Sequence, residues 1–149
     1  MTDNRAPWWL KPANRIYKVL LRRGVVIGKE RSVVLTVTGR TSGKPRSTPV
    51  TPMHIAGNRY VVAVYPGADW VRNVRADDAA TLTEGRRTER VRLVELTPEL
   101  AGPVLRLFPT QLPTGVAFVQ RAGLVTDGSP AEFEALAGRL PVFRIDPIT

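Results

Sequence analysis

The chain has 149 residues, of which 43% are hydrophobic, and this suits one domain with a core of its own. It contains no cysteine and a single histidine, His54, which excludes a thiolate nucleophile, a disulfide, a sulfur-ligated metal and a multi-histidine metal site. The net charge of +9 suits nucleic acid, an anionic membrane surface or an anionic small molecule, although a genome that favours arginine codons would give the same excess.

The N-terminal part predicts a short amphipathic helix over residues 12–23 that starts at Pro12 and ends before Gly24. A Trp-Trp pair at 8–9 next to a basic helix is typical of a membrane-surface segment, and packing on the rest of the protein is the alternative. We expect residues 1–24 to be a helical segment of one domain that spans the whole chain. No secretory signal or membrane-spanning run is visible, so we expect a cytoplasmic protein, peripheral to the membrane if this helix binds it.

From residue 32 onward, β-branched runs bounded by turn residues predict about six strands, mostly linked as hairpins. Pro49 and Pro52 require an edge strand or a bulge, and Gly57-Asn58 is a hairpin turn signal. The expected strands are 32–39, 46–56, 59–65, 80–84, 87–96 and 141–145.

Three further segments predict helices, each with a capping residue at its start, over 69–76, 97–108 and 129–140. The stretch 109–128 is weakly patterned and is expected to be a connection that acts as a lid. Because the strands are hairpin-linked and no glycine-rich turn opens a long helix, the pattern favours a mainly β antiparallel barrel with peripheral helices over a Rossmann sheet.

The stretch TVTGRTSGKPRSTPV, residues 36–50, places three cations together with the hydroxyls of Thr41, Ser42, Ser47 and Thr48 at one turn between two strands. Arg40, Lys44 and Arg46 suit a phosphate or carboxylate group. We expect Gly39 and Gly43 to leave backbone N–H groups open as an anion nest. A solvated hairpin turn is the alternative.

Two stretches, LTVTGRTSGKPRSTPV at 35–50 and GNRYVVAVYPGADWVRNVRADDAATL at 57–82, resemble the deazaflavin-dependent nitroreductases, a family also described as F420H2-dependent quinone reductases. The shared pattern is a strand ending in T-x-G-R-x-S-G-x-x-R-x-x-P, a second strand, a small-residue turn and a W-x-x-N helix. The resemblance covers residues 32–96, and PVFRI at 141–145 is also similar. It implies a split β-barrel, as in the FMN-binding split-barrel proteins.

The resemblance also implies a cofactor, coenzyme F420, and the residues that bind it. The positions for its anionic phosphodiester and oligoglutamate portion are Arg40, Thr41, Ser42 and Arg46. The strand beneath the deazaflavin comprises Ser47, Thr48, Pro49, Val50 and Thr51. Backbone N–H groups at the ring edge belong to Val62, Ala63, Val64 and Tyr65. The helix start beside the cofactor comprises Asp69, Trp70, Val71, Arg72 and Asn73, where Trp70 either shields a ring face or packs in the core.

The implied activity is hydride transfer from reduced F420 to a hydrophobic acceptor such as a quinone, an enone or a nitroaromatic, without a metal. The chain departs from the family in its turn, Val64-Tyr65-Pro66-Gly67, and in lacking tyrosines in the C-terminal helices. The expected lid instead offers apolar side chains, namely Phe108, Leu112, Val116, Phe118 and Leu124. No catalytic side chain is identified, and His54 is expected to be structural.

Two other functions remain open: an FMN-dependent split-barrel oxidoreductase, and a non-catalytic deazaflavin-binding or membrane-surface protein. Nucleic-acid binding is disfavoured, because no strand interleaves exposed aromatic and basic residues. The oligomeric state, monomer or homodimer, is also open.

Overall fold

The computed structural model describes residues 32–65 and 67–148. The predicted N-terminal helix and the Trp-Trp pair lie outside these residues. None of the described helices is long and apolar enough to cross a membrane.

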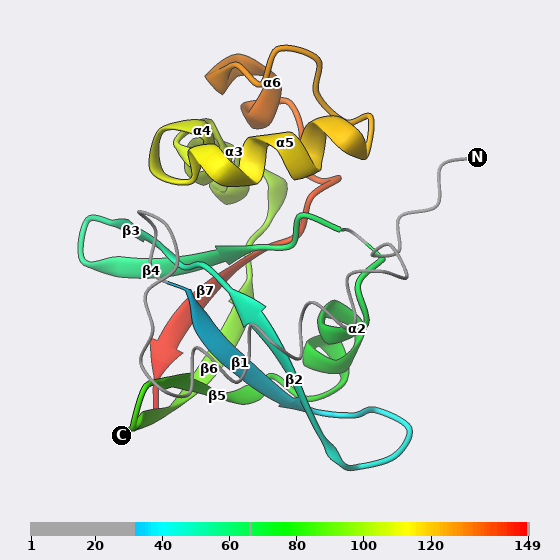
Figure 1. The fold of residues 1–149 in the computed structure, drawn as a ribbon, viewed down its shortest axis with the longest axis vertical. Helices are drawn as coiled ribbons and strands as arrows, with labels where there is room; N and C mark the ends of the chain where they lie inside the picture. The colour runs from blue at the N-terminus through cyan, green and yellow to red at the C-terminus, as the bar shows by residue number, and fades with distance from the viewer. Residues whose placement is uncertain (1–31, 66, 149) are drawn as a thin grey trace.

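The described residues form one antiparallel sheet of seven strands with the order β2-β1-β5-β6-β7-β4-β3 (Figure 1). This confirms the expected mainly β fold with peripheral helices. One strand more than expected is present, because the predicted strand 46–56 is divided into β2 and β3. The strands are β1 Val33–Thr38, β2 Pro45–Val50, β3 Met53–Ile55, β4 Asn58–Val62, β5 Ala79–Glu84, β6 Arg87–Glu95 and β7 Val142–Pro147.

The connection between β2 and β3 explains why the sheet curls. These strands lie at the two opposite edges of the sheet, yet only Thr51 and Pro52 separate them in sequence. Each neighbouring pair in the sheet is antiparallel, so β2 and β3 run in the same direction. They form one bent run that pairs with β1 through its first half and with β4 through its second half. A sheet can meet this requirement only by bending its two edges toward each other, as in a split barrel.

The bend also sets where the barrel stays open. The β3–β4 ladder ends at the pair Met53–Tyr60, and residues 62–65 form no ladder with β2. Pro52 lies at this point because it has no N–H to donate to a ladder. The edge of β2 and residues 62–65 therefore lie on the two sides of the split.

Two apolar clusters form the core. The first fills the curled sheet and includes Leu35, Val91 and Phe143, with α2, Asp69–Ala76, packed against it through Val71. The second lies between the sheet and the helical layer made of α3 Pro98–Arg106, α4 Phe108–Gln111, α5 Pro113–Arg121 and α6 Pro130–Glu134. These four helices lie together beyond one end of the sheet, whereas α2 lies apart from them (Figure 1).

Three sequence predictions of local structure are wrong. The segment 109–128 is largely helical, because Pro109 and Pro113 stand in the first turns of α4 and α5, where proline is favoured. The last predicted helix ends as a regular helix at Glu134 and continues as turns. The β3–β4 turn is formed by Ala56 and Gly57, with φ of +51° and +83°, because Asn58 already pairs with Ile55.

Candidate functional site

The turn between β1 and β2, residues 39–44, is closed by its own backbone. The N–H of Gly39 donates to the carbonyl of Lys44 at 2.8 Å, and the N–H of Gly43 donates to the carbonyl of Gly39 at 2.8 Å. The N–H of Lys44 donates to Ser42 Oγ at 3.2 Å. The expected anion nest at the two glycines is therefore wrong, because a tight turn uses these donors to satisfy its own acceptors. An anion at this turn would be bound mainly by side chains.

The two glycines are required for different reasons. Gly43 has φ of +69°, in the left-handed region that glycine adopts at no steric cost. A Cβ at Gly39 would lie 2.7 Å from Ser42 Oγ and 3.2 Å from the carbonyl oxygen of Lys44. Gly39 is therefore needed for the close approach of the two ends of the turn.

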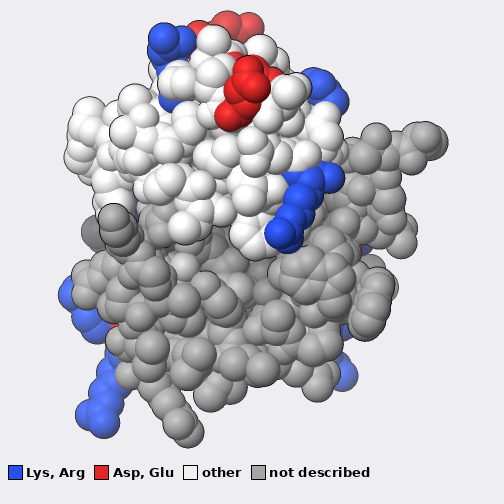
Figure 2. Space-filling model, turned by 45° about the horizontal axis from the view of Figure 1, so that its top comes forward, with Lys and Arg blue, Asp and Glu red and all other residues white. Residues whose placement is uncertain are grey.

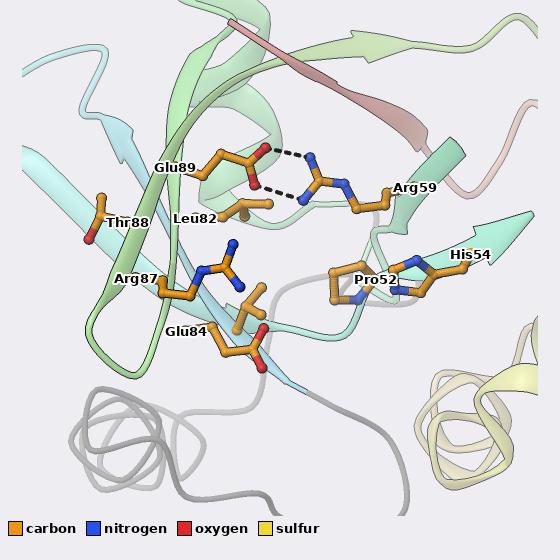
Figure 3. Close-up of a pocket in the computed structure, with 9 residues that line it drawn as sticks. Pro52, His54, Arg59, Leu82, Glu84, Arg87, Thr88 and Glu89 are labelled. Carbon is orange, nitrogen blue, oxygen red and sulfur yellow. Dashed lines mark hydrogen bonds and ion pairs between the residues drawn. The ribbon is translucent and has the colours of Figure 1, made fainter. Parts of the chain in front are cut away.

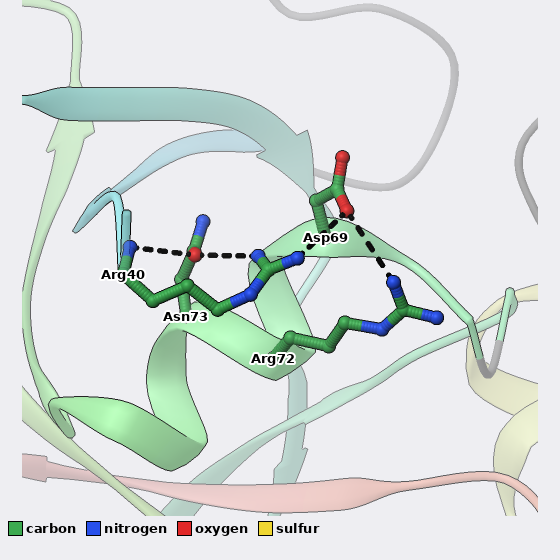
Figure 4. Close-up of polar contacts among 4 residues, drawn as sticks. All are labelled: Arg40, Asp69, Arg72 and Asn73. Carbon is green, nitrogen blue, oxygen red and sulfur yellow. Dashed lines mark hydrogen bonds and ion pairs between the residues drawn. The ribbon is translucent and has the colours of Figure 1, made fainter. Parts of the chain in front are cut away.

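Arg40 joins this turn to α2, 33 residues later in the sequence (Figure 4). The backbone N–H of Arg40 and its Nη1 both donate to Oδ1 of Asn73, at 3.0 Å and 2.8 Å. Asn73 is only 4% exposed, so these bonds satisfy a buried amide oxygen. Asp69 Oδ1 lies 3.6 Å from Arg40 Nη2 and 4.0 Å from Arg72 Nη1. Of the predicted residues, Arg40 of the turn and Asp69, Arg72 and Asn73 of the helix start thus lie in one polar network.

Lys44 and Arg46 differ from Arg40 in their surroundings. Both are exposed, and neither forms an ion pair with a described residue. Thr41 and Ser42, beside them on the turn, are also exposed. Two exposed cations and two hydroxyls fit a multiply charged anionic group, because they bind it without first breaking an ion pair with another described residue. The sequence motif named Lys44 as a cation suited to an anion, whereas the family resemblance did not include it among the cofactor residues.

The strand β2 forms one side of the split. The Ser47 hydroxyl forms a hydrogen bond of 2.8 Å with the hydroxyl of Thr36 on β1. The Thr51 hydroxyl forms one of 2.8 Å with the hydroxyl of Ser32, directly before β1. The side chains from Ser47 to Thr51 are half-buried, and Val50 packs against the first core cluster. No described strand pairs with the edge of β2 that faces away from β1. A planar ring beside this edge would find both apolar surface and backbone polar groups.

Residues 62–65 form the other side of the split. The N–H of Ala63 donates to the carbonyl of Pro141 at 2.9 Å, so this group is not available to a cofactor. Because successive N–H groups of a strand point to opposite sides, the N–H of Val62 points away from β7 and toward the split, whereas Val64 and Tyr65 lie in a bend. The side chains of Val62 and Ala63 are buried in the core, so only their backbone is a candidate for ring contacts.

The start of α2 is held by apolar packing. Trp70 is half-buried and packs on Phe143 of β7, with ring centroids 5.4 Å apart. Val71 is fully buried in the first core cluster. Trp70 therefore has a packing role, and its partial exposure leaves part of the indole at the surface next to the polar network.

A cavity of about 540 Å³ lies away from this network, at the opposite end of β1 (Figure 3). Val33, Pro52 and Leu82 supply apolar lining, and the Arg59–Glu89 pair crosses its wall through two bonds of 2.8 Å. These bonds lower the pKa of the Glu89 carboxyl. None of the predicted cofactor residues lines the cavity. We therefore assign the candidate site to the β1–β2 turn and the split, and not to this cavity.

The comparisons with known proteins bear on the whole arrangement. The family model for F420H2-dependent quinone reductases matches residues 11–114, about two thirds of the chain, including the turn, the split and α2. The chain belongs to the F420H2-dependent quinone reductase family. The reductase is accordingly an oxidoreductase that uses coenzyme F420.

Solved structures agree on the fold. The reductase is 22% identical to a structure described as an F420-H2-dependent reductase (FDR-A), with a TM-score of 0.55 over 82% of this chain and 98% of that one. It is also 22% identical to a domain-swapped dimer, with a TM-score of 0.57 over 93% and 97% of the two chains. A protein of unknown function from Agrobacterium tumefaciens, Atu2129, is 16% identical, with a TM-score of 0.58 over 95% and 55%. No curated protein matches the sequence.

Proposed function

We propose that the reductase passes a hydride from reduced F420 to a hydrophobic acceptor of the quinone type, across the split of the barrel. The observation that carries this proposal is the turn 39–44, which Arg40 fixes to α2 through Asn73, with the exposed cations Lys44 and Arg46 at its end and at the start of β2. No described strand pairs with the edge of β2 that faces away from β1. Cations suited to an anion next to the half-buried residues 47–51 support the proposal.

In this arrangement the protein binds and orients. Lys44 and Arg46 bind the anionic portion of the cofactor, and Arg40 holds the turn in place. Residues 47–51 and the N–H of Val62 hold the ring between the two sides of the split. F420 itself supplies the hydride when bound, and the apolar surroundings exclude water from it.

The composition of the helical layer is evidence for a hydrophobic acceptor. Residues 107–120 contain no charged residue, and Figure 2 shows a largely uncharged surface over the helices. The expected lining is corrected in part, because Phe108 and Leu112 are buried in the second core cluster. Phe118, Val116 and Leu124 are only partly buried, which leaves them as the apolar side chains for an acceptor.

The deciding experiment is a titration of the purified protein with F420 and with FMN, followed by quenching of tryptophan fluorescence. We expect F420 to bind with micromolar or tighter affinity and in preference to FMN, since its tail carries more charge for the turn. Turnover of F420H2 with a naphthoquinone should then accompany binding. Tight binding of FMN without any F420 signal would favour the FMN-dependent alternative, and binding of F420 without turnover would favour a non-catalytic carrier.

We also propose that residues 1–24 give peripheral contact with an anionic membrane surface. Residues 1–31 hold eight of the 22 basic residues and two of the 13 acidic ones, so they carry six of the nine net positive charges. A membrane-soluble quinone would then be reduced at the bilayer surface.

A further inference from the structure

Tyr65 lies where the barrel, α2 and the helical layer meet. It follows β4 at the end of the segment that borders the split, and its carbonyl accepts the N–H of Ala68 at 2.9 Å, directly before α2. Its ring meets Phe118 of α5 edge to face, with centroids 6.5 Å apart and planes at 79°. The sequence indicated that the C-terminal helices lack a tyrosine, but the fold brings this tyrosine to them from the sheet.

The surroundings of Tyr65 keep its hydroxyl protonated and still allow it to lose a proton. Burial of the half-buried ring raises the pKa of Tyr65, and the positive charge of Arg121 on α5 acts in the opposite direction. A phenol in such a place is a neutral donor at physiological pH, and a nearby guanidinium stabilises the phenolate left after donation. Arg121 lies in the last turn of α5, three residues after Phe118.

The part of the helical layer that adjoins Tyr65 through Phe118 offers no acid. Residues 107–120 contain no Asp, Glu, His, Lys, Arg or Tyr, so α4 and the part of α5 beside Phe118 cannot supply a proton from a titratable side chain. A hydride acceptor between the split and this layer would meet apolar groups and Tyr65. Reduction of a quinone to a hydroquinone takes up one hydride and one proton, so a proton source is needed where water is excluded.

We propose that Tyr65 donates a proton to the oxygen of the reduced acceptor and that Phe118 and Arg121 position and tune it. The inference rests on the proposed function. In this step, the quinone-type acceptor gains one hydrogen and two electrons as a hydride from reduced F420, which is oxidised. The Tyr65 O–H bond breaks, the proton bonds to the acceptor oxygen, and the phenolate left beside Arg121 takes a proton back from water.

Tyr65→Phe tests the proposal, with Tyr60→Phe as the matched control. Tyr60 lies on β4, five residues before Tyr65, is also half-buried and packs on the second core cluster, so its substitution removes a hydroxyl from the preceding strand. With F420H2 and a naphthoquinone, we expect kcat to fall at least about tenfold in Tyr65→Phe and to stay within about twofold of wild type in Tyr60→Phe. The dissociation constant for F420 should be unchanged in both variants.

A second measurement needs no cofactor. Absorbance titration of the phenolates should show one tyrosine with a raised pKa that is missing in Tyr65→Phe, and Arg121→Gln should move it higher because a stabilising charge is gone. In wild type, kcat should fall as pH rises through this pKa, and Tyr65→Phe should lose that dependence.

The outcomes separate this inference from the proposed function. If wild-type protein turns over but Tyr65→Phe matches Tyr60→Phe, the proton-donor role is overturned and the reductase function stands. If wild-type protein neither binds F420 nor reduces a quinone, both are overturned. An Arg121→Gln variant with an unshifted phenol would overturn the tuning role of Arg121.

Discussion

At the scale of single residues, Arg40 on the β1–β2 turn and Arg46 at the start of β2 lie in different surroundings. Arg46 is exposed and forms no ion pair with a described residue, whereas Arg40 bonds to the buried amide of Asn73. One bidentate contact to a phosphate or carboxylate is worth about 1.5–3 kcal/mol. We therefore expect Arg46→Ala to raise the dissociation constant for F420 roughly tenfold or more at unchanged folding stability.

The control for this measurement is Arg86→Ala, which removes the same charge from the exposed β5–β6 turn at the other end of β1. It should leave the dissociation constant nearly unchanged at moderate ionic strength, where distant charges are screened. Equal effects of the two variants would mean that net charge, and not a contact at the turn, governs F420 binding.

Asn73 is the residue that fixes the turn, and its loss should appear in stability. Asn73→Ala leaves the backbone N–H of Arg40 without its acceptor, and an unsatisfied buried group of this kind costs about 1–3 kcal/mol. Arg40→Ala removes the Nη1 bond and the ion pair of Nη2 with Asp69, but it keeps the backbone bond to Asn73. We expect urea unfolding to show a larger loss for Asn73→Ala than for Arg40→Ala, and the reverse order would refute this account of the network.

At the scale of elements, the β3–β4 hairpin stores strain at one position. Ala56 has φ of +51°, which costs an L-residue with a Cβ roughly 1–2 kcal/mol, and it precedes Gly57 in a turn where Asn-Gly is strongly preferred. Ala56→Asn should raise the free energy of unfolding by about 1 kcal/mol. Ala56→Val, β-branched at the same φ, should lower it, and thermal unfolding of both variants would show whether the two changes have opposite signs.

The loop before α6 depends on one carboxylate. Glu132 accepts the N–H groups of Thr126, Asp127 and Gly128 at 2.7–2.9 Å, while its own N–H donates to the capping hydroxyl of Ser129. The bond from Thr126, followed by those from the other backbone groups, lowers the pKa of Glu132. A lowered pKa gives stability that is present above the ordinary glutamate value and is lost as pH falls through the folded-state value.

Glu132→Gln should therefore lower Tm at neutral pH, and the difference from wild type should shrink as the solution is acidified below pH values near the ordinary pKa of about 4.5. Scanning calorimetry of both proteins across this range measures it. A Tm difference that is the same at every pH would mean that the carboxylate charge is not what holds the loop.

At the scale of the whole molecule, different groups of basic residues carry the two proposed functions: residues 1–24 carry membrane contact, and Lys44 and Arg46 carry cofactor binding. Removal of residues 1–23 should abolish weak, salt-sensitive binding to anionic vesicles, since each cation near such a surface contributes about 1 kcal/mol. In the full chain, replacing Trp8 and Trp9 together by serine should weaken sedimentation with vesicles without changing F420 affinity. If the wild-type protein does not sediment at low salt, the membrane proposal fails and the cofactor proposal is unaffected.

The sequence by itself determined the mainly β fold, most of the strands, the turn motif and the family, because these depend on local order: alternation along a strand, glycine at a tight turn, and cations at fixed spacing. It did not show that the predicted strand 46–56 is divided into β2 and β3. It also predicted α2 at residues 69–76, as found. It missed helices α4 and α5, since proline at the first turn of a helix resembles proline in a loop.

Only the tertiary structure decided what depends on contacts between distant segments. It showed that the side-chain oxygen of Asn73 accepts a hydrogen bond from the N–H of Arg40, and that the carbonyl of Pro141 accepts one from the N–H of Ala63. It also brought Tyr65 of the sheet against Phe118 of α5. Each contact joins residues that are far apart in the chain. The curvature of the sheet brings these residues close together, and this curvature results from the bent run of β2 and β3. Local patterns do not encode that curvature, because it results from closing two edges that the sequence places only two residues apart.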